Sequence, residues 1–148
     1  MLQLENILEL WNKDCQIDRL KLDDASLETP KLHSKYLQLY AIVKLQHKKL
    51  DLKYKTLLKH KFLWYNGKLS RSQMDDLGWG YDALNGLKIL KGDMDKYYDS
   101  DVDIQTMQLQ LFELKTVLDT LEEIINNVKW RHSTIKNALD FRRFESGA

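Results

Sequence analysis

Apolar residues recur at steps of three and four through much of the chain, a spacing that places them on one side of an α-helix. The first such stretch covers residues 2–15. Its apolar side is formed by Leu4, Ile7, Leu8 and Trp11. A short amphipathic helix is therefore predicted at the start of the chain.

A longer stretch covers residues 30–65, with no glycine and no proline after Pro30. Proline is tolerated in the first turn of a helix, so we expect a helix that begins at Pro30, with Ser26 or Thr29 as its cap and 16–29 as a connector. Asn66-Gly67 predicts its end. Its seam, the row of positions along one side, is Tyr36, Tyr40, Val43, His47, Leu50, Tyr54, Leu57, Lys61 and Trp64.

Five of the six glycines fall in residues 66–100, which predicts an irregular connector there. We expect short helices and turns within it, with a helix near Asp82–Leu90. Residues 101–145 again lack glycine and proline and carry a sustained seam of the coiled-coil type. We expect a C-terminal oligomerisation helix, or helices, over this range.

An unbroken helix over residues 101–145 would be about 65 Å long, and we expect the rest of the chain to be too small to cover it. Either the helix bends back near Asn126-Asn127, or a second subunit covers its seam. We favour self-association. The predicted oligomerisation residues are Leu111, Leu114, Leu118, Leu121, Ile125, Val128, Ile135 and Leu139.

These patterns together predict a mainly α fold, a single domain over residues 1–148 that assembles as a homo-oligomer. Cys15 is the only cysteine, which excludes an internal disulfide. The absence of a signal-peptide pattern and of an apolar run of about 18 residues predicts an intracellular protein with no membrane span.

The net charge of +1 conceals a strong polarisation along the sequence. Residues 44–71 carry nine basic residues and one acidic residue, whereas residues 75–123 carry twelve acidic and four basic residues. Partners are therefore to be sought segment by segment.

Within the basic segment, lysines alternate with aromatic residues close to the Asn66-Gly67 turn. Cations neutralise phosphates, and flat rings stack on bases that are not already stacked in a duplex, so this pattern favours binding of single-stranded nucleic acid. The alternative is a helix with solvated lysines and with Trp64 and Tyr65 in the core. The candidate contact residues are Lys55, Lys59, His60, Lys61, Trp64, Tyr65, Lys68 and Arg71.

Other chemistry finds little support. The acidic run from Asp93 to Asp103 lacks the glycine and the terminal glutamate of a calcium-binding loop, so we expect Ser100 or Asp101 to cap a helix instead. No cysteine–histidine spacing suggests zinc, and no phosphate-binding loop or nucleophile–base spacing is present. We expect neither enzymatic activity nor a metal or cofactor.

The order of these features resembles the UvsY family, the recombination mediators of T-even-like phages. Leu58–Gly67 is similar to the family motif leucine-lysine-alanine-arginine-leucine-aspartate-tyrosine-tyrosine-serine-glycine. Ser34–Leu37 and the ending Arg142–Gly147 are also similar to family segments. In the motif, Lys59 matches the lysine and Lys61 replaces the arginine, which keeps the charge but loses the planar fork.

The resemblance implies a phage protein of DNA recombination, repair and replication, in the cytoplasm of the infected bacterial host. It also implies a ring-forming homo-oligomer that binds single-stranded DNA and helps a RecA-like recombinase load onto strands held by single-strand-binding protein. The basic residues of the motif are implicated in DNA binding in that family. From the residues alone, a coiled-coil scaffold without a nucleic-acid role stays open.

Overall fold

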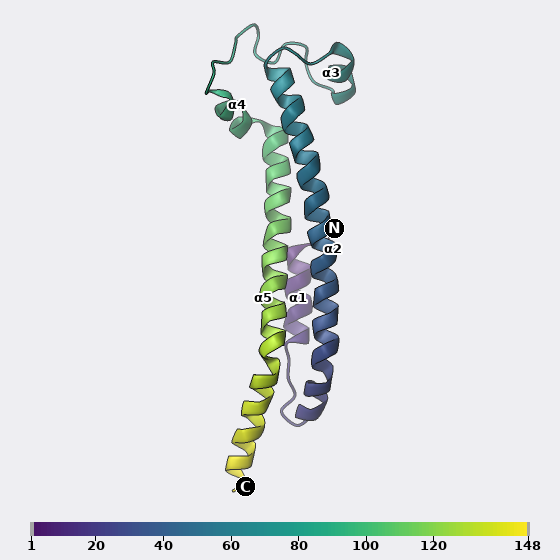
Figure 1. Cartoon of the computed structure of the whole chain (residues 1–148), viewed down its shortest axis with the longest axis vertical. Coiled ribbons are helices and arrows are strands. Elements are labelled where there is room, and N and C mark those ends of the chain that lie inside the picture. Colours follow the sequence, from purple (N-terminus) through teal and green to yellow (C-terminus); the bar gives the residue numbers. More distant parts are fainter. Residues whose placement is uncertain (1, 148) are drawn as a thin grey trace. The chain divides into compact units, whose positions relative to one another are not determined.

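The computed structural model describes residues 2–147, which form five helices and no strand. In chain order these are α1 (Leu4–Asp14), α2 (Leu22–Tyr65), α3 (Arg71–Leu77), α4 (Met94–Ser100) and α5 (Val102–Glu145) (Figure 1). The predicted mainly α class, with long helices and an irregular glycine-containing middle, is confirmed. Among these described helices, none combines the length and apolar character that crossing a membrane requires.

Helix α2 begins at Leu22, eight residues earlier than predicted, so Pro30 lies in its interior and not in its first turn. The predicted connector over 16–29 is therefore correct only for residues 16–21, and the caps at Ser26 and Thr29 are wrong. The Thr29 hydroxyl donates to the Ala25 carbonyl within the helix. The physical reason is the seam, which continues back in steps of three and four from Tyr36 to the buried Leu22. Burial of this side offsets the hydrogen bond that Pro30 cannot make.

The other end of α2 follows its local sequence. The helix ends at Tyr65, Gly67 adopts a left-handed φ of 69°, and the Lys68 amide donates back to the Leu63 carbonyl at 2.7 Å. This is the backbone pattern that commonly closes a helix at glycine. The predicted stop at Asn66-Gly67 is confirmed.

The helix predicted near Asp82–Leu90 is wrong, because Asn85 and Gly86 both have positive φ values, 50° and 82°, which interrupt a right-handed helix. Residues 66–100 do contain short helices and turns as expected, but the helices are α3 and α4, which lie on either side of residues 82–90 in the chain. Helix α3 begins where the Ser70 hydroxyl accepts a hydrogen bond from the Gln73 amide, and it ends at Gly78 in the left-handed conformation.

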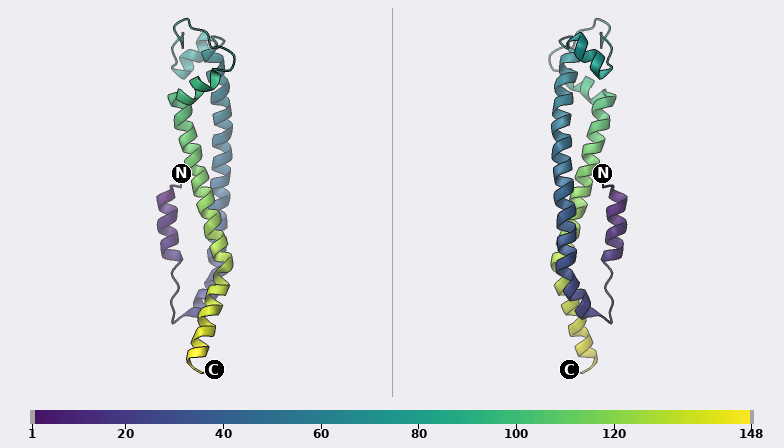
Figure 2. Two further views of the ribbon diagram at one scale, coloured as in Figure 1. Left: turned by 90° about the vertical axis from the view of Figure 1, so that its left-hand side faces the viewer. Right: turned by 90° about the vertical axis from the view of Figure 1, so that its right-hand side faces the viewer.

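The described residues form two compact units, and the first combines residues up to His47 with residues from Glu113 onward. In this unit α1 contacts both long helices, whose segments run antiparallel (Figures 1 and 2). The Trp11 and Tyr36 rings meet edge to face, and the Arg131 guanidinium donates to the Asp14 carbonyl. The buried core of this unit is Ile7, Leu22, Tyr36, Val43, Leu114, Val117, Leu118, Leu121, Ile124, Ile125, Val128 and Ile135.

This core corrects the expectation that a second subunit is needed to cover the α5 seam. Helix α5 is unbroken past Asn126-Asn127, and most of its seam is buried within the chain. The expectation failed because α2 is itself 44 residues long and, with α1, supplies the cover. Of the predicted oligomerisation residues, Leu114, Leu118, Leu121, Ile125, Val128 and Ile135 are buried here, and Leu111 and Leu139 are half-buried.

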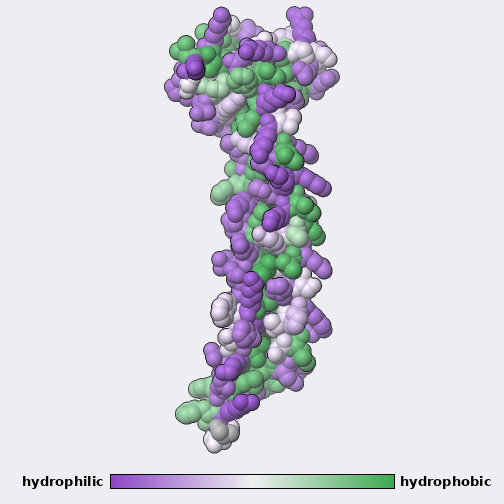
Figure 3. Space-filling view, in the orientation of Figure 1, coloured by the Kyte–Doolittle hydropathy of each residue, from purple (hydrophilic) through white to green (hydrophobic). Residues whose placement is uncertain are grey.

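The second unit spans Lys48–Phe112 and contains the end of α2, the irregular segment with α3 and α4, and the start of α5. Its buried apolar side chains are only Leu69, Met74 and Ile104 among the residues described. Lys61 and Asp101 are buried beside them. On the molecular face in Figure 3, hydrophobic side chains are scattered among hydrophilic ones.

Candidate nucleic-acid interface

Lys61, predicted to offer its charge to a phosphate, is instead enclosed within the second unit. Its side chain is 3% exposed, and its ammonium lies 2.7 Å from the Asp103 carboxylate and 3.0 Å from that of Asp101. The prediction that Lys61 faces solvent is wrong. Its seam position was the available signal, since seam residues of α2 face the interior.

The Lys61 ammonium also lies against two indole rings. It is 4.1 Å from the ring centroid of Trp79 and 4.6 Å from that of Trp64, within the range of cation–π attraction. The Trp64 indole N–H donates to the Gly80 carbonyl at 2.7 Å, which ties the irregular segment to α2. Sequence reasoning missed Trp79, because nothing in the pattern of residues 66–100 indicated which of them would return to α2.

Tyr65 completes this cluster. Its hydroxyl donates to the Asp101 carboxylate at 2.6 Å, while the other carboxylate oxygen accepts from the Ile104 amide and caps α5. The predicted cap at Asp101 is confirmed. We call Lys61, Trp64, Tyr65, Trp79, Asp101 and Asp103 the lysine box.

Two groups in the lysine box have shifted pKa values. Burial raises the pKa of Asp101, but hydrogen bonds from the Tyr65 hydroxyl, the Ile104 amide and Lys61 outweigh burial and hold that pKa below its usual value. Burial and the hydrogen bond to Asp101 raise the pKa of Tyr65. At neutral pH the phenol is therefore protonated and the carboxylate charged, which is the state that the hydrogen bond requires.

The remaining candidate cations lie at the surface. Lys55, Lys59, Lys68 and Arg71 are exposed, and His60 is half-buried. The Lys55 ammonium is 3.1 Å from the Asp51 carboxylate, but its side chain stays open to solvent. Lys55 and Lys59 are four residues apart and so lie on the same side of α2.

Arg71 lies in α3, with its guanidinium 5.0 Å from the ring centroid of Tyr81. Tyr81 is 57% exposed in the irregular segment, and its hydroxyl donates a hydrogen bond to Asp75. Among the candidates, Lys61 is thus buried, His60 and the aromatic pair are half-buried, and the other four cations are exposed. The half-buried positions of Trp64 and Tyr65 agree better with the alternative prediction, in which these two residues belong to the core.

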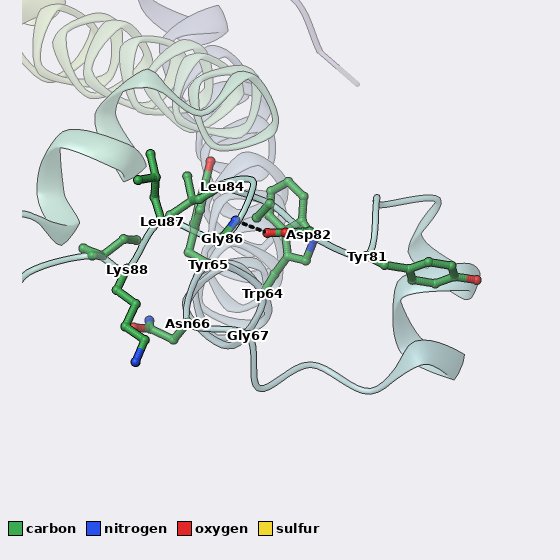
Figure 4. A pocket seen from close by; sticks show the side chains of 12 residues that line it. Trp64, Tyr65, Asn66, Gly67, Tyr81, Asp82, Leu84, Gly86, Leu87 and Lys88 are labelled. Carbon is green, nitrogen blue, oxygen red and sulfur yellow. Dashed lines mark hydrogen bonds between the residues drawn. The ribbon is translucent and has the colours of Figure 1, made fainter.

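A cavity of about 350 Å³ opens beside this aromatic pair (Figure 4). Its walls come from the end of α2 and from the loop that precedes α4. Within it, one Asp82 carboxylate oxygen accepts a hydrogen bond from the Gly86 amide, while Tyr81 points away from the other lining side chains. The lining residues are Trp64, Tyr65, Asn66, Gly67, Tyr81, Asp82, Ala83, Leu84, Gly86, Leu87, Lys88 and Ile89. No sequence pattern had indicated the loop residues.

Three comparisons place this architecture among known proteins. The model of the family described as "Recombination, repair and ssDNA binding protein UvsY" matches residues 10–148. The recombination protein uvsY of Enterobacteria phage T4 is 26% identical over 146 residues, which cover 99% of each protein.

Solved structures of the bacteriophage T4 recombination mediator protein UvsY have the same fold. One crystal form matches with a TM-score of 0.82 at 23% identity and covers 99% of each chain. A second form matches with a TM-score of 0.79 at 24% identity and covers 95% of this chain and 98% of that chain.

Proposed function

Since this chain belongs to the UvsY family of recombination, repair and single-stranded-DNA-binding proteins, we propose that it binds single-stranded DNA through exposed lysines at the end of α2. Bound there, it promotes loading of a RecA-like recombinase onto strands covered by single-strand-binding protein. The setting is the cytoplasm of an infected bacterial cell.

The observation that carries this proposal is that a basic surface stays exposed on α2 although Lys61 is buried in the lysine box. Lys48, Lys55 and Lys59 are spaced by seven and four residues and share one side of α2, where Asp51 is the only acid within residues 44–71. Lys68 and Arg71 follow directly after the helix. Phosphates bound along this surface would displace condensed counterions, which makes affinity strongly dependent on salt.

A homo-oligomer arranged as a ring is part of the same proposal. With most of the α5 seam buried in the chain's own core, the contacts between subunits fall to exposed side chains. Helix α5 leaves Trp130, Phe141 and Phe144 widely exposed, and we place the contacts between subunits at these side chains. Several basic surfaces on one assembly would hold a strand through many weak contacts.

The site is tested with Lys55→Gln/Lys59→Gln. Removing two phosphate contacts per subunit is expected to weaken binding of labelled oligodeoxythymidine and to lower the slope of log affinity against log salt by at least about 1.4, at about 0.7 per contact on a single strand. Fluorescence anisotropy across a salt series measures both quantities.

The matched control is Lys31→Gln/Lys136→Gln, which removes the same charge from exposed lysines away from the basic segment. Light scattering establishes that all variants assemble alike. If the two double variants bind with the same affinity and salt slope, the lysines at the end of α2 are not the contact. If the unaltered protein binds no strand at any salt concentration, the scaffold alternative holds.

The loading role has its own assay. The DNA-dependent ATPase of a RecA-like recombinase is measured on single strands already covered by single-strand-binding protein. The protein is expected to restore the ATPase rate, and Lys55→Gln/Lys59→Gln is expected to restore it less at equal concentration. Failure of the unaltered protein to restore the rate would contradict the loading role and leave strand binding intact.

A further inference from the structure

We propose that the cavity beside Trp64 receives one unstacked nucleobase of the bound strand, so that each subunit holds a base as well as phosphates. This inference deepens the proposed function and rests on it. Neither the basic surface nor the lysine box requires the cavity, so the base site can fail while strand binding stands.

The size and walls of the cavity suit a base. Its volume of about 350 Å³ lies at the lower end of the range for small-molecule sites, about 300–1,000 Å³. The Trp64 ring forms one wall, and its orientation is set by the hydrogen bond to Gly80 and by contact with Trp79 at a centroid distance of 5.2 Å. A ring already held in place stacks on a base without first losing its own freedom.

The polar groups in the cavity suit the edge of a base. Asp82 uses one carboxylate oxygen for the Gly86 amide, and a carboxylate has further acceptor capacity for the N–H groups of a base. Figure 4 shows the Asp82 carboxylate beside the Trp64 ring and the Leu87 side chain on another wall. The walls therefore combine apolar side chains such as Leu87 with polar groups such as Asp82, which matches the flat apolar faces and the polar edge of a base.

The charges around the cavity suit the backbone of the same strand. Lys88 lines the cavity, and Lys68 is exposed one residue after Gly67, another lining residue. Lys59 and Asn66 are seven residues apart, so Lys59 lies on the side of α2 that leads to the cavity. A strand could therefore follow the basic surface and turn one base inward. A base paired within a duplex could not enter, which provides a structural basis for preferring single strands.

The test compares two strands of equal length and equal phosphate number, oligodeoxythymidine and a strand made of abasic sites. If a base enters the cavity, the unaltered protein binds oligodeoxythymidine at least about 5-fold more tightly, since base–aromatic stacking contributes that much or more per base. Anisotropy at one fixed salt concentration gives the ratio of the two affinities. Equal binding of both strands overturns the base site but leaves phosphate binding in place, whereas binding of neither strand contradicts the proposed function itself.

Two loop variants locate the base. Leu87 lines the cavity and Leu90 does not, yet both are 72% exposed. Leu87→Glu and Leu90→Glu therefore add the same charge in the same loop with little effect on the core. Leu87→Glu is expected to bring the affinity ratio close to one, and Leu90→Glu to retain the ratio of the unaltered protein. Equal ratios in the two variants would place the base elsewhere and overturn the assignment.

Discussion

The two units each contain a tyrosine, an aspartate and a lysine that meet at one carboxylate oxygen. In the first unit the Asp14 carboxylate accepts from the Tyr36 hydroxyl at 2.9 Å and from the Lys35 ammonium at 2.5 Å. The Lys35 side chain is 41% exposed and that of Asp14 is 22% exposed. Water therefore shares in the solvation of this ion pair, and its net contribution to stability is small.

In the second unit the Asp101 carboxylate meets Tyr65 and Lys61 in the same way, but the lysine and aspartate side chains are only 3% and 4% exposed. Each charge there depends on its partner, because little water can replace the partner. The same three types of side chain thus form a partly exposed ion pair in the first unit and a buried ion pair in the second. The surroundings decide which, since the first unit has a large apolar core and the second has few buried apolar residues.

The largest expected effect is the difference in stability lost when Lys61 or Lys35 is replaced. Lys61→Met keeps the apolar stem but leaves the Asp101 carboxylate buried without its cation, so we expect a loss of about 3–5 kcal/mol in the free energy of unfolding. Lys35→Met removes an exposed partner and is expected to cost about 0–1 kcal/mol. Denaturant titration measures both, and hydrogen exchange over residues 62–104 shows whether the loss is local. If the two variants are equally stable, burial does not make the Lys61 ion pair more important for stability than the Lys35 ion pair.

A second test compares apolar cores. Leu121 is fully buried in the first unit, and Leu121→Ala is expected to cost about 2–5 kcal/mol because it leaves a cavity among tightly packed neighbours. Met74 is 7% exposed in α3, where few buried apolar side chains surround it. Met74→Ala is therefore expected to reduce the free energy of unfolding by an amount at or below the lower end of that range. A larger loss from Met74→Ala, measured by the same titration, would show that the second unit also depends on its apolar residues.

The two tyrosines give a finer comparison. Tyr65→Phe and Tyr36→Phe each remove one hydroxyl donor to a carboxylate, and a hydrogen bond to a charged group contributes about 1.5–3 kcal/mol. We expect the loss from Tyr65→Phe to be the greater, because Asp101 has less access to water than Asp14. Thermal unfolding followed by circular dichroism ranks the two variants. The reverse ranking would mean that exposure does not set the strength of these bonds.

The loss of stability at acidic pH provides another test of the two aspartates. Burial raises the pKa of Asp14, but hydrogen bonds from Lys35 and Tyr36 outweigh it, so that pKa, like that of Asp101, lies below its usual value. A lowered pKa in the folded state adds stability above the unfolded-state pKa of about 3.9, and this stability is lost as the pH falls through the folded-state pKa. Both units should therefore lose stability below about pH 4.

Denaturant titrations at a series of pH values test this expectation. Asp101→Asn and Asp14→Asn should each give a shallower dependence on acid than the unaltered protein. Asp140→Asn, which alters an exposed aspartate within four residues of Lys136 on α5, serves as the control and should leave the dependence nearly unchanged. The same slope in all three variants would show that other carboxyl groups govern the acid response.

Several features could be predicted from the sequence because they depend on neighbours within a few residues. The period of apolar positions indicated α1, α2 and α5, and Asn66-Gly67 indicated the end of α2. Ser100 or Asp101 was expected to cap α5. Local hydrogen bonds and helix geometry determine such features, so the residue order is sufficient to predict them.

The candidate site itself depended on contacts between distant residues. The return of Trp79 to Lys61, the loop that brings Asp82 beside Trp64, and the start of α2 ahead of Pro30 all follow from which surfaces are buried together. The sequence alone determined the long helices, their seams and the basic stretch. Only the tertiary structure decided which lysines remain in solvent, because a charge stays exposed or becomes enclosed according to the side chains that the whole fold brings around it.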